Sequence, residues 1–203
     1  MPDIVKDKFF EIFGGKAGSD CKNLIKSYSE PHRFYHTIHH VHDCMEKFIQ
    51  IEHHLTDRYS VGIALLYHDI VYDPKADNNE EKSAKTARRV MMKYDFDTAK
   101  TDKVYEFILL TKHPSEPNSV DEQFLIDIDL SILGASPEIY KTYEENIRKE
   151  YSFVPEYLYK KGRSKLLQTF LNKKKIFKTE IFAELYEGHA RNNLAAAISK
   201  LLR

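Results

Sequence analysis

The histidines are spread unevenly along this 203-residue chain. Five of the ten histidines lie between His32 and His42, in PHRFYHTIHHVHD, and another precedes an aspartate in LLYHDIVYD. Imidazole nitrogens and carboxylate oxygens are the ligands that Mn, Fe, Co and Mg accept, whereas two cysteines are too few for an all-sulfur site. These two segments therefore predict a divalent-metal site.

Several residues of the histidine-rich segment compete as ligands. If the segment is helical, His36, His40 and Asp43 follow one another at spacings of four and three, so they share a helix face. His39 flanks that face, and the segment holds a His-Asp doublet of its own, in which His42 precedes Asp43. Residue types and spacing alone leave the choice open.

The second doublet, His68-Asp69, follows the apolar run at residues 63–66 near the end of an expected helix. A carboxylate beside such a run is costly unless it is paired or binds a metal. Adjacent residues project about 100° apart on a helix, so both reach one ion only if other helices supply the remaining ligands. A lone His-Asp doublet also arises readily by chance. We therefore expect a site assembled between helices.

The rest of the chain predicts an all-α fold that positions these residues. Apolar residues recur every three or four positions, and the sequence lacks the long Val/Ile/Thr alternation of half-buried strands. Thr56 or Asp57 is expected to cap the helix that carries the second doublet, and Pro137 suits a first helical turn. The expected helices cover about 3–13, 20–28, 37–55, 57–72, 80–94, 98–112, 122–133, 137–150, 155–172 and 178–202.

Composition predicts one globular domain over residues 1–203. Lys+Arg and Asp+Glu are equal at 31 each, so no net field attracts nucleic acid or an anionic membrane. No signal peptide or membrane span is evident, and Cys21 and Cys44 resemble buried thiols of a reducing compartment. We expect a cytoplasmic protein without nucleic-acid or membrane partners, and we leave a homodimer open.

The ordered set His40, His68, Asp69 and Asp129 resembles the HD-domain superfamily of metal-dependent phosphohydrolases, whose signature is a histidine, a His-Asp doublet and a distant aspartate. Within it, the chain resembles the small predicted metal-dependent HD phosphohydrolases. The matching segments are RFYHTIHHV (33–41), LLYHDIVYD (65–73), NNEEKSA (78–84), DIDLSILG (127–134) and ARNNL (190–194). The resemblance implies a helical bundle with its metal-site core at about 30–135 and additional C-terminal helices at about 136–203.

The resemblance selects His40, His68, Asp69 and Asp129 as ligands of one divalent ion. It does not distinguish Mn, Fe, Co, Mg, Ni and Zn, and a second ion stays open. Asp127 is the fallback for Asp129, because an i,i+2 spacing turns two side chains to different sides of a helix.

YHTIHH also resembles the Tyr-His-Asn-x-x-His element of cyclic-nucleotide phosphodiesterases, another branch of the superfamily, with Thr37 in place of the asparagine. In that element the earlier histidine protonates the leaving oxygen, which implies His36 as general acid. Asp69 is expected to help hold the attacking water. Glu80 and Glu81 match a Glu-Glu element of the resembling family, which implies that Glu81, or Glu80 in its place, positions that water or a ligand histidine. First-turn helix charge explains both residues equally well.

Arg33, Lys112 and His113 are the expected binders of substrate phosphate, and arginine is favoured because its contact is bidentate. For Lys112 and His113, charge at a helix end is the alternative explanation. The implied function is a metal-dependent phosphohydrolase that uses metal-activated water on a small phosphoester, with a nucleotide or related metabolite favoured. The alternative is a non-catalytic metal- and nucleotide-binding sensor module.

Overall fold

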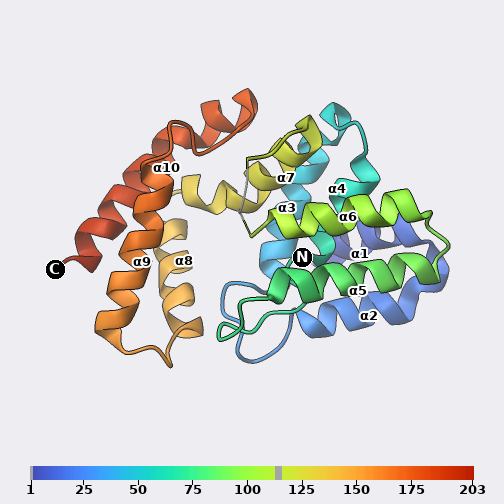
Figure 1. The fold of residues 1–203 in the computed structure, drawn as a ribbon, viewed down its shortest axis with the longest axis horizontal. Helices are drawn as coiled ribbons and strands as arrows, with labels where there is room; N and C mark the ends of the chain where they lie inside the picture. Colours follow the sequence, from blue (N-terminus) through green and yellow to red (C-terminus); the bar gives the residue numbers. More distant parts are fainter. Residues whose placement is uncertain (1, 113–115) are drawn as a thin grey trace. The chain divides into compact units, whose positions relative to one another are not determined.

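The structure, a computed structural model, describes residues 2–112 and 116–203, and every regular element within these ranges is a helix (Figure 1). The all-α prediction is confirmed. The chain divides into two compact units, unit 1 ending at Asp129 and unit 2 covering Leu130–Arg203. Among the described residues, no helix combines the length and the apolar character that a membrane span requires.

Unit 1 is built around a central helix. Its elements are α1 (Pro2–Phe13), η1 (Gly15–Ala17), α2 (Gly18–Ser27), α3 (Ile38–Ile51), η2 (Glu52–His54), α4 (Arg58–Tyr67), α5 (Asn79–Lys93), α6 (Thr98–Leu110) and α7 (Val120–Leu130). Helix α4 contacts α1, α3, α5 and α6, and α5 lies beside α6 (Figure 1). Residues 60–67 are all buried, as expected for a helix that is apolar on every side.

Both ends of α4 depend on side chains. The carboxylate of Asp57 caps the first turn by accepting the backbone N–H of Ser60 at 3.1 Å, which settles the choice between Thr56 and Asp57. The helix ends at Tyr67, five residues before the expected end at about 72. The expected extension was wrong because the Tyr28 hydroxyl takes backbone groups that the next turn would need: it donates to the Leu66 carbonyl and accepts the N–H of Asp69.

Helix α3 begins at Ile38, one residue after its expected start, and does not include His36. The Thr37 hydroxyl accepts the N–H of His39 at 3.3 Å and makes Thr37 the N-cap, so the helix starts at Ile38. The expectation that His36 and His40 share one face of a helix was therefore wrong. His36 lies in the loop that enters α3.

Helix α7 is anchored to the loop before α4 by a buried carboxylate. Asp121 accepts the N–H groups of Thr56, at 2.8 Å, and Asp57, at 3.1 Å, and lies 3.3 Å from Lys103 Nζ. Asp129 lies about 12 Å further along the same helix, at 1.5 Å per residue. The anchor therefore determines where Asp129 enters the interior of unit 1.

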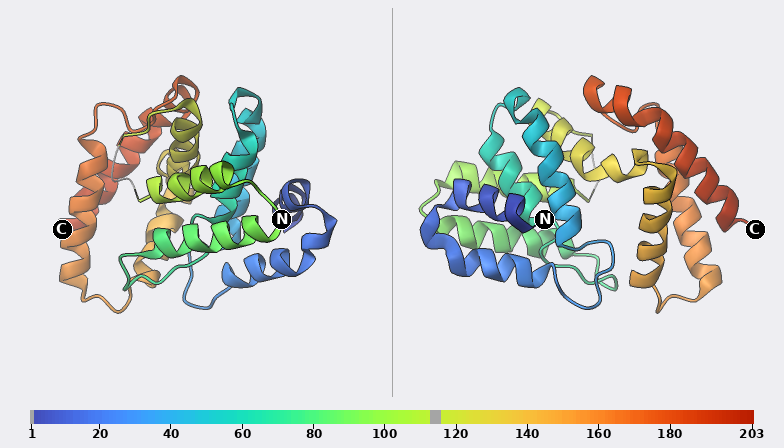
Figure 2. Two further views of the ribbon diagram at one scale, coloured as in Figure 1. Left: turned by 45° about the vertical axis from the view of Figure 1, so that its right-hand side comes forward. Right: turned by 180° about the vertical axis from the view of Figure 1, so that it is seen from behind.

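Unit 2 consists of η3 (Ser131–Gly134), α8 (Pro137–Glu150), α9 (Glu156–Leu171) and α10 (Glu180–Leu201). Helix α10 packs against α9 and η3 (Figure 2). A Cβ at Gly134 would lie 2.5 Å from Tyr186 Cβ and 2.7 Å from its carbonyl oxygen, so α10 approaches η3 too closely for any side chain there. Asn193 adds hydrogen bonds to the carbonyls of Leu133 and Ala135, both at 2.9 Å.

Candidate metal centre

Four side chains from three stretches of unit 1 converge. His40 comes from α3, His68 and Asp69 from the end of α4, and Asp129 from the last turn of α7. The Nε2 atoms of His40 and His68 are 3.0 Å apart. Asp69 Oδ2 lies 3.1 Å from His68 Nε2, and Asp129 Oδ1 lies 3.3 Å from His40 Nε2. The structure thus brings together the four residues that the sequence singled out as ligands, which we call the tetrad.

The far nitrogen of each imidazole is held by a group outside the tetrad. His68 Nδ1 lies 2.9 Å from the carbonyl oxygen of Leu65, which can only accept, so Nδ1 carries the proton and donates it. In the neutral ring, Nε2 then presents its lone pair to the tetrad. His40 Nδ1 lies 3.0 Å from the Tyr35 hydroxyl. Metal-binding histidines are usually held in this way, so the arrangement fits both rings as Nε2 ligands.

The tetrad is buried, yet its members favour their charged forms because they face one another. Burial disfavours the imidazolium of His68, but Asp69 and Asp129 outweigh that effect and raise its pKa well above the usual value. Burial disfavours the Asp129 carboxylate, but hydrogen bonds with His40 and His68 hold its pKa well below the usual value. Asp69 is likewise held below its usual pKa, by His68 and then by His36.

Such a cluster needs either a hydrogen-bonding proton or a metal ion between its two imidazoles. Two Nε2 lone pairs at 3.0 Å repel each other unless a proton or a metal ion lies between them. Two nitrogen and two carboxylate donors suit a divalent transition metal. The histidine side chains are 4% and 2% exposed, whereas those of Asp69 and Asp129 are 18% and 14% exposed. The carboxylate side of the tetrad is therefore the side that meets solvent.

His36 lies beside the tetrad without belonging to it. Its ring stacks on Tyr72, with centroids 4.2 Å apart, and meets the His40 ring edge-on at 6.1 Å. Its charge also contributes to the lowered pKa of Asp69, which places the imidazole near that carboxylate. The geometry is compatible with a proton donor next to the centre.

Arg33 has a different place from the one that the sequence predicted. Nη1 donates to the carbonyls of His36, at 3.0 Å, and Asp69, at 2.7 Å, and Nη2 donates to that of Ile70 at 3.0 Å. Nε donates to the carboxylate of Glu30 at 3.0 Å, and the side chain is fully buried. These contacts hold the backbone around Asp69 and do not direct the guanidinium toward a phosphate. The geometry supports a positioning role for Arg33.

The remaining predicted site residues are separate from the tetrad or not described. Glu81 pairs with Lys85 at 2.6 Å on the exposed face of α5, which matches the alternative explanation of first-turn helix charge. Glu80 lies 3.9 Å from Lys112 Nζ, which also donates to the carbonyl of Asp77. His113 lies outside the described residues.

Some residues of the site were missed in the sequence. Tyr35 opens the YHTIHH element but was given no role, and Tyr28 belongs to no motif. The Tyr28 hydroxyl donates to the Leu66 carbonyl at 3.1 Å and accepts the N–H of Asp69 at 3.3 Å. Cys44, one helical turn after His40, could have been found from its i,i+4 spacing. Asp127, the fallback ligand, is fully buried, while Asp129 is the α7 carboxylate that faces the two histidines.

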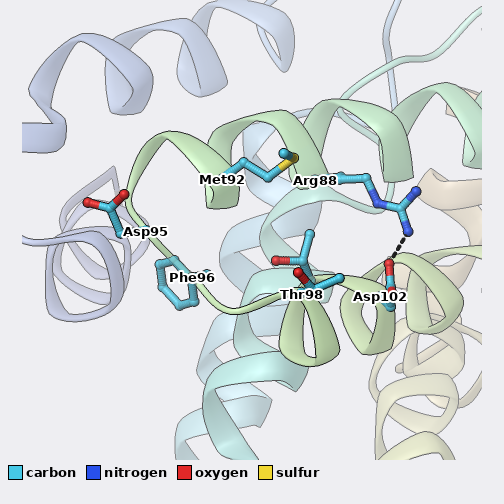
Figure 3. Close-up of a pocket in the computed structure, with 7 residues that line it drawn as sticks. Arg88, Met92, Asp95, Phe96, Thr98 and Asp102 are labelled. Carbon is cyan, nitrogen blue, oxygen red and sulfur yellow. Dashed lines mark hydrogen bonds and ion pairs between the residues drawn. The ribbon is translucent and has the colours of Figure 1, made fainter.

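Two surface hollows of unit 1 lie away from the tetrad. One, of about 520 Å³, lies between the end of α5 and the start of α6 (Figure 3). Its only arginine, Arg88, is paired there with Asp102, so its charge is already matched. The other, of about 560 Å³, is lined partly by Tyr67, Ile70 and Val71. No tetrad residue lines either hollow, so neither defines the site.

Comparison of the chain with protein-family models, curated proteins and solved structures gave no match. The fold and the site together show the general class of the protein, although they name no family. It is an all-α protein with a buried group of histidine, aspartate and cysteine side chains that could hold a metal ion.

Proposed function

We propose that the chain is a metal-dependent phosphohydrolase of the HD type that acts on a small phosphoester, with a nucleotide or related metabolite as the favoured class. The main support is the convergence of His40, His68, Asp69 and Asp129 in one buried cluster. A phosphate-ester hydrolase needs an electrophile, an oriented water and a proton donor. The tetrad and its neighbour His36 offer residues for all three.

A divalent ion, when bound, lowers the pKa of a coordinated water and withdraws charge from phosphoryl oxygens. Its ligands would be His40, His68, Asp69 and Asp129. Asp69 and Asp129 are the tetrad members partly open to solvent, so water and substrate approach on that side. Asp69, whose lowered pKa keeps it an acceptor, orients the attacking water through a hydrogen bond. His36 protonates the departing oxygen.

Arg33 contributes by holding these groups in register, because its Nη1 bonds the carbonyls of both His36 and Asp69. The substrate phosphate must therefore be bound elsewhere. Lys112 is the remaining described candidate from the predicted set, with a side chain that is 51% exposed. Its ammonium group would act as a point charge.

The test is hydrolysis by the purified protein with Mn, Co, Fe, Zn and Mg across a panel of phosphomonoesters, nucleotides and cyclic nucleotides. We expect metal-dependent turnover that is lost in His68→Ala and Asp129→Ala and strongly reduced in His36→Gln. His53→Gln, in η2, is the matched control and should keep full activity. No turnover with any metal, together with saturable nucleotide binding, would replace the enzyme with the sensor module. Equal metal content in the wild type and both alanine variants would remove the metal centre.

A further inference from the structure

A buried thiol lies against the candidate metal centre. Cys44 is on α3, one turn after His40, and is 2% exposed. Its Sγ lies 3.8 Å from Nδ1 and 3.9 Å from Nε2 of His40. The sulfur, a ring nitrogen of His40 and a carboxylate oxygen of Asp129 all lie within 4.8 Å of one another. The thiol therefore faces polar ligand atoms within the buried interior.

These separations are close to those of atoms that share one ion. Zinc bonds of about 2.3 Å to sulfur and about 2.1 Å to nitrogen allow the two ligands to lie up to about 4.4 Å apart. The 3.9 Å between Cys44 Sγ and His40 Nε2 falls within that limit. Spacing by four residues keeps both side chains on one face of α3. A small rotation of the Cys44 side chain is therefore enough to direct its sulfur at an ion bound by His40.

The second cysteine provides the contrast. Cys21, on α2, is also buried, at 3% exposure, but it belongs to none of the groups among the described residues that could hold an ion. A thiol in apolar surroundings is inert and serves as packing. Cys44 instead touches an imidazole of the tetrad and lies near one of its carboxylates.

We propose that Cys44 is a fifth ligand of the metal centre, an inference that rests on the proposed function. On binding, a sulfur–metal bond forms and the S–H proton leaves for the buffer, so the chain supplies a thiolate. Thiolate sulfur prefers softer ions, so the centre selects Zn, Fe or Co over Mg or Mn.

Cobalt substitution tests this directly, because thiolate coordination to Co²⁺ adds a sulfur-to-metal charge-transfer band in the near ultraviolet. We expect that band in the cobalt-loaded wild type. It should be lost in Cys44→Ser and Cys44→Ala and retained in Cys21→Ser, the matched control. X-ray absorption of the zinc-loaded wild type should show a sulfur neighbour at about 2.3 Å and needs no substituted protein, so a folding defect in a variant cannot obscure the answer.

The possible failures are distinguishable. A cobalt-loaded wild type with nitrogen and oxygen ligands only, or a band that persists in Cys44→Ala, overturns the role of Cys44 and leaves the metal centre intact. A band that is lost equally in Cys21→Ser also overturns it. Failure of the wild type to bind Co²⁺ and Zn²⁺ overturns this inference, and failure to bind Mn²⁺, Fe²⁺ and Mg²⁺ as well overturns the proposed function.

Discussion

Arg33 Nη1 donates to the main-chain carbonyl of Asp69 at 2.7 Å, so a side chain from the loop before α3 holds the turn that follows α4. The same nitrogen binds the carbonyl of His36 at 3.0 Å. One guanidinium thus sets the spacing between the proposed proton donor and a proposed metal ligand. Tyr28 also stabilises this turn, because its hydroxyl accepts the N–H of Asp69.

Replacing Arg33 by lysine should destabilise the protein even though the charge is kept. A lysine cannot satisfy the carbonyls of His36, Asp69 and Ile70 together, and each buried carbonyl left unpaired costs about 1–3 kcal/mol. We expect the free energy of unfolding in urea to fall by at least about 2 kcal/mol. Arg58→Lys, at a position 44% exposed, is the control and should change little. Equal stability of Arg33→Lys and the wild type would contradict the positioning role.

Metal removal should lower the thermal stability of the wild type. Ligands that bind only the folded state stabilise it, by about 2.7 kcal/mol at a concentration one hundred times the dissociation constant. Stripping with a chelator should therefore lower the melting temperature, and adding Zn²⁺ or Co²⁺ should restore it. Asp129→Asn should lose the response, whereas His53→Gln should keep it. A melting temperature that ignores metal in every variant would argue against a bound ion.

Metal affinity should rise with pH through the range in which His68 loses its proton. Burial opposes the charged form of His68, but Asp69 and Asp129 raise its pKa well above the usual value, so a proton competes with a metal for Nε2. Binding in a weakly buffered solution should consequently release protons. Calorimetry in two buffers of different ionisation enthalpy measures the number of protons released for each metal ion bound. A value of zero would show that the metal binds elsewhere.

The cap of α4 should give a pH-dependent contribution to stability. Burial opposes ionisation of Asp57, but hydrogen bonds from Ser60 and the charge of Lys103 lower its pKa below 3.8. The contribution is therefore fully present above the unfolded pKa of 3.8 and is lost as pH falls through the lower folded value. Asp57→Asn keeps the cap and removes the charge, so its difference from the wild type should shrink between pH 7 and pH 3. A constant difference would refute this assignment.

Two glycine substitutions in unit 2 should have opposite effects. Gly134→Ala places a Cβ 2.5 Å from Tyr186 and should cost about 1–3 kcal/mol through overpacking. Gly162→Ala, in the middle of α9 with open space around it, should stabilise by about 0.5–1 kcal/mol. Thermal unfolding of both proteins provides the comparison. A Gly134→Ala protein as stable as the wild type would contradict the packing described for η3 and α10.

Periodicity and caps were enough to predict most helices, because both are local properties of the chain. The errors arose where distant contacts decide. Helix α4 stops at Tyr67 because Tyr28, far away in the sequence, binds the Leu66 carbonyl and the N–H of Asp69, and no local pattern encodes those contacts. The boundary of α3 moved by one residue because Thr37 caps the helix instead of entering it.

The same contrast between local patterns and distant contacts applies to the residues of the site. The residues of the tetrad could be selected by motif order, and the structure brings them together. The place of a charged side chain such as Arg33 or Glu81 could not be predicted, because it depends on which partner lies nearest. Glu81 pairs with Lys85 on its own helix, whereas Arg33 binds one carbonyl of its own loop and two carbonyls of the turn after α4.

The tetrad draws its members from α3, the end of α4 and the end of α7, so no fragment shorter than most of unit 1 contains all four. An ion held there cannot survive the separation of these helices. Unfolding of unit 1 therefore releases the ion. A chromophoric chelator in the solution would change colour when unit 1 unfolds and releases its ion. Unit 2 contributes no member of the tetrad, so its unfolding would leave the colour unchanged, and the two transitions could be told apart.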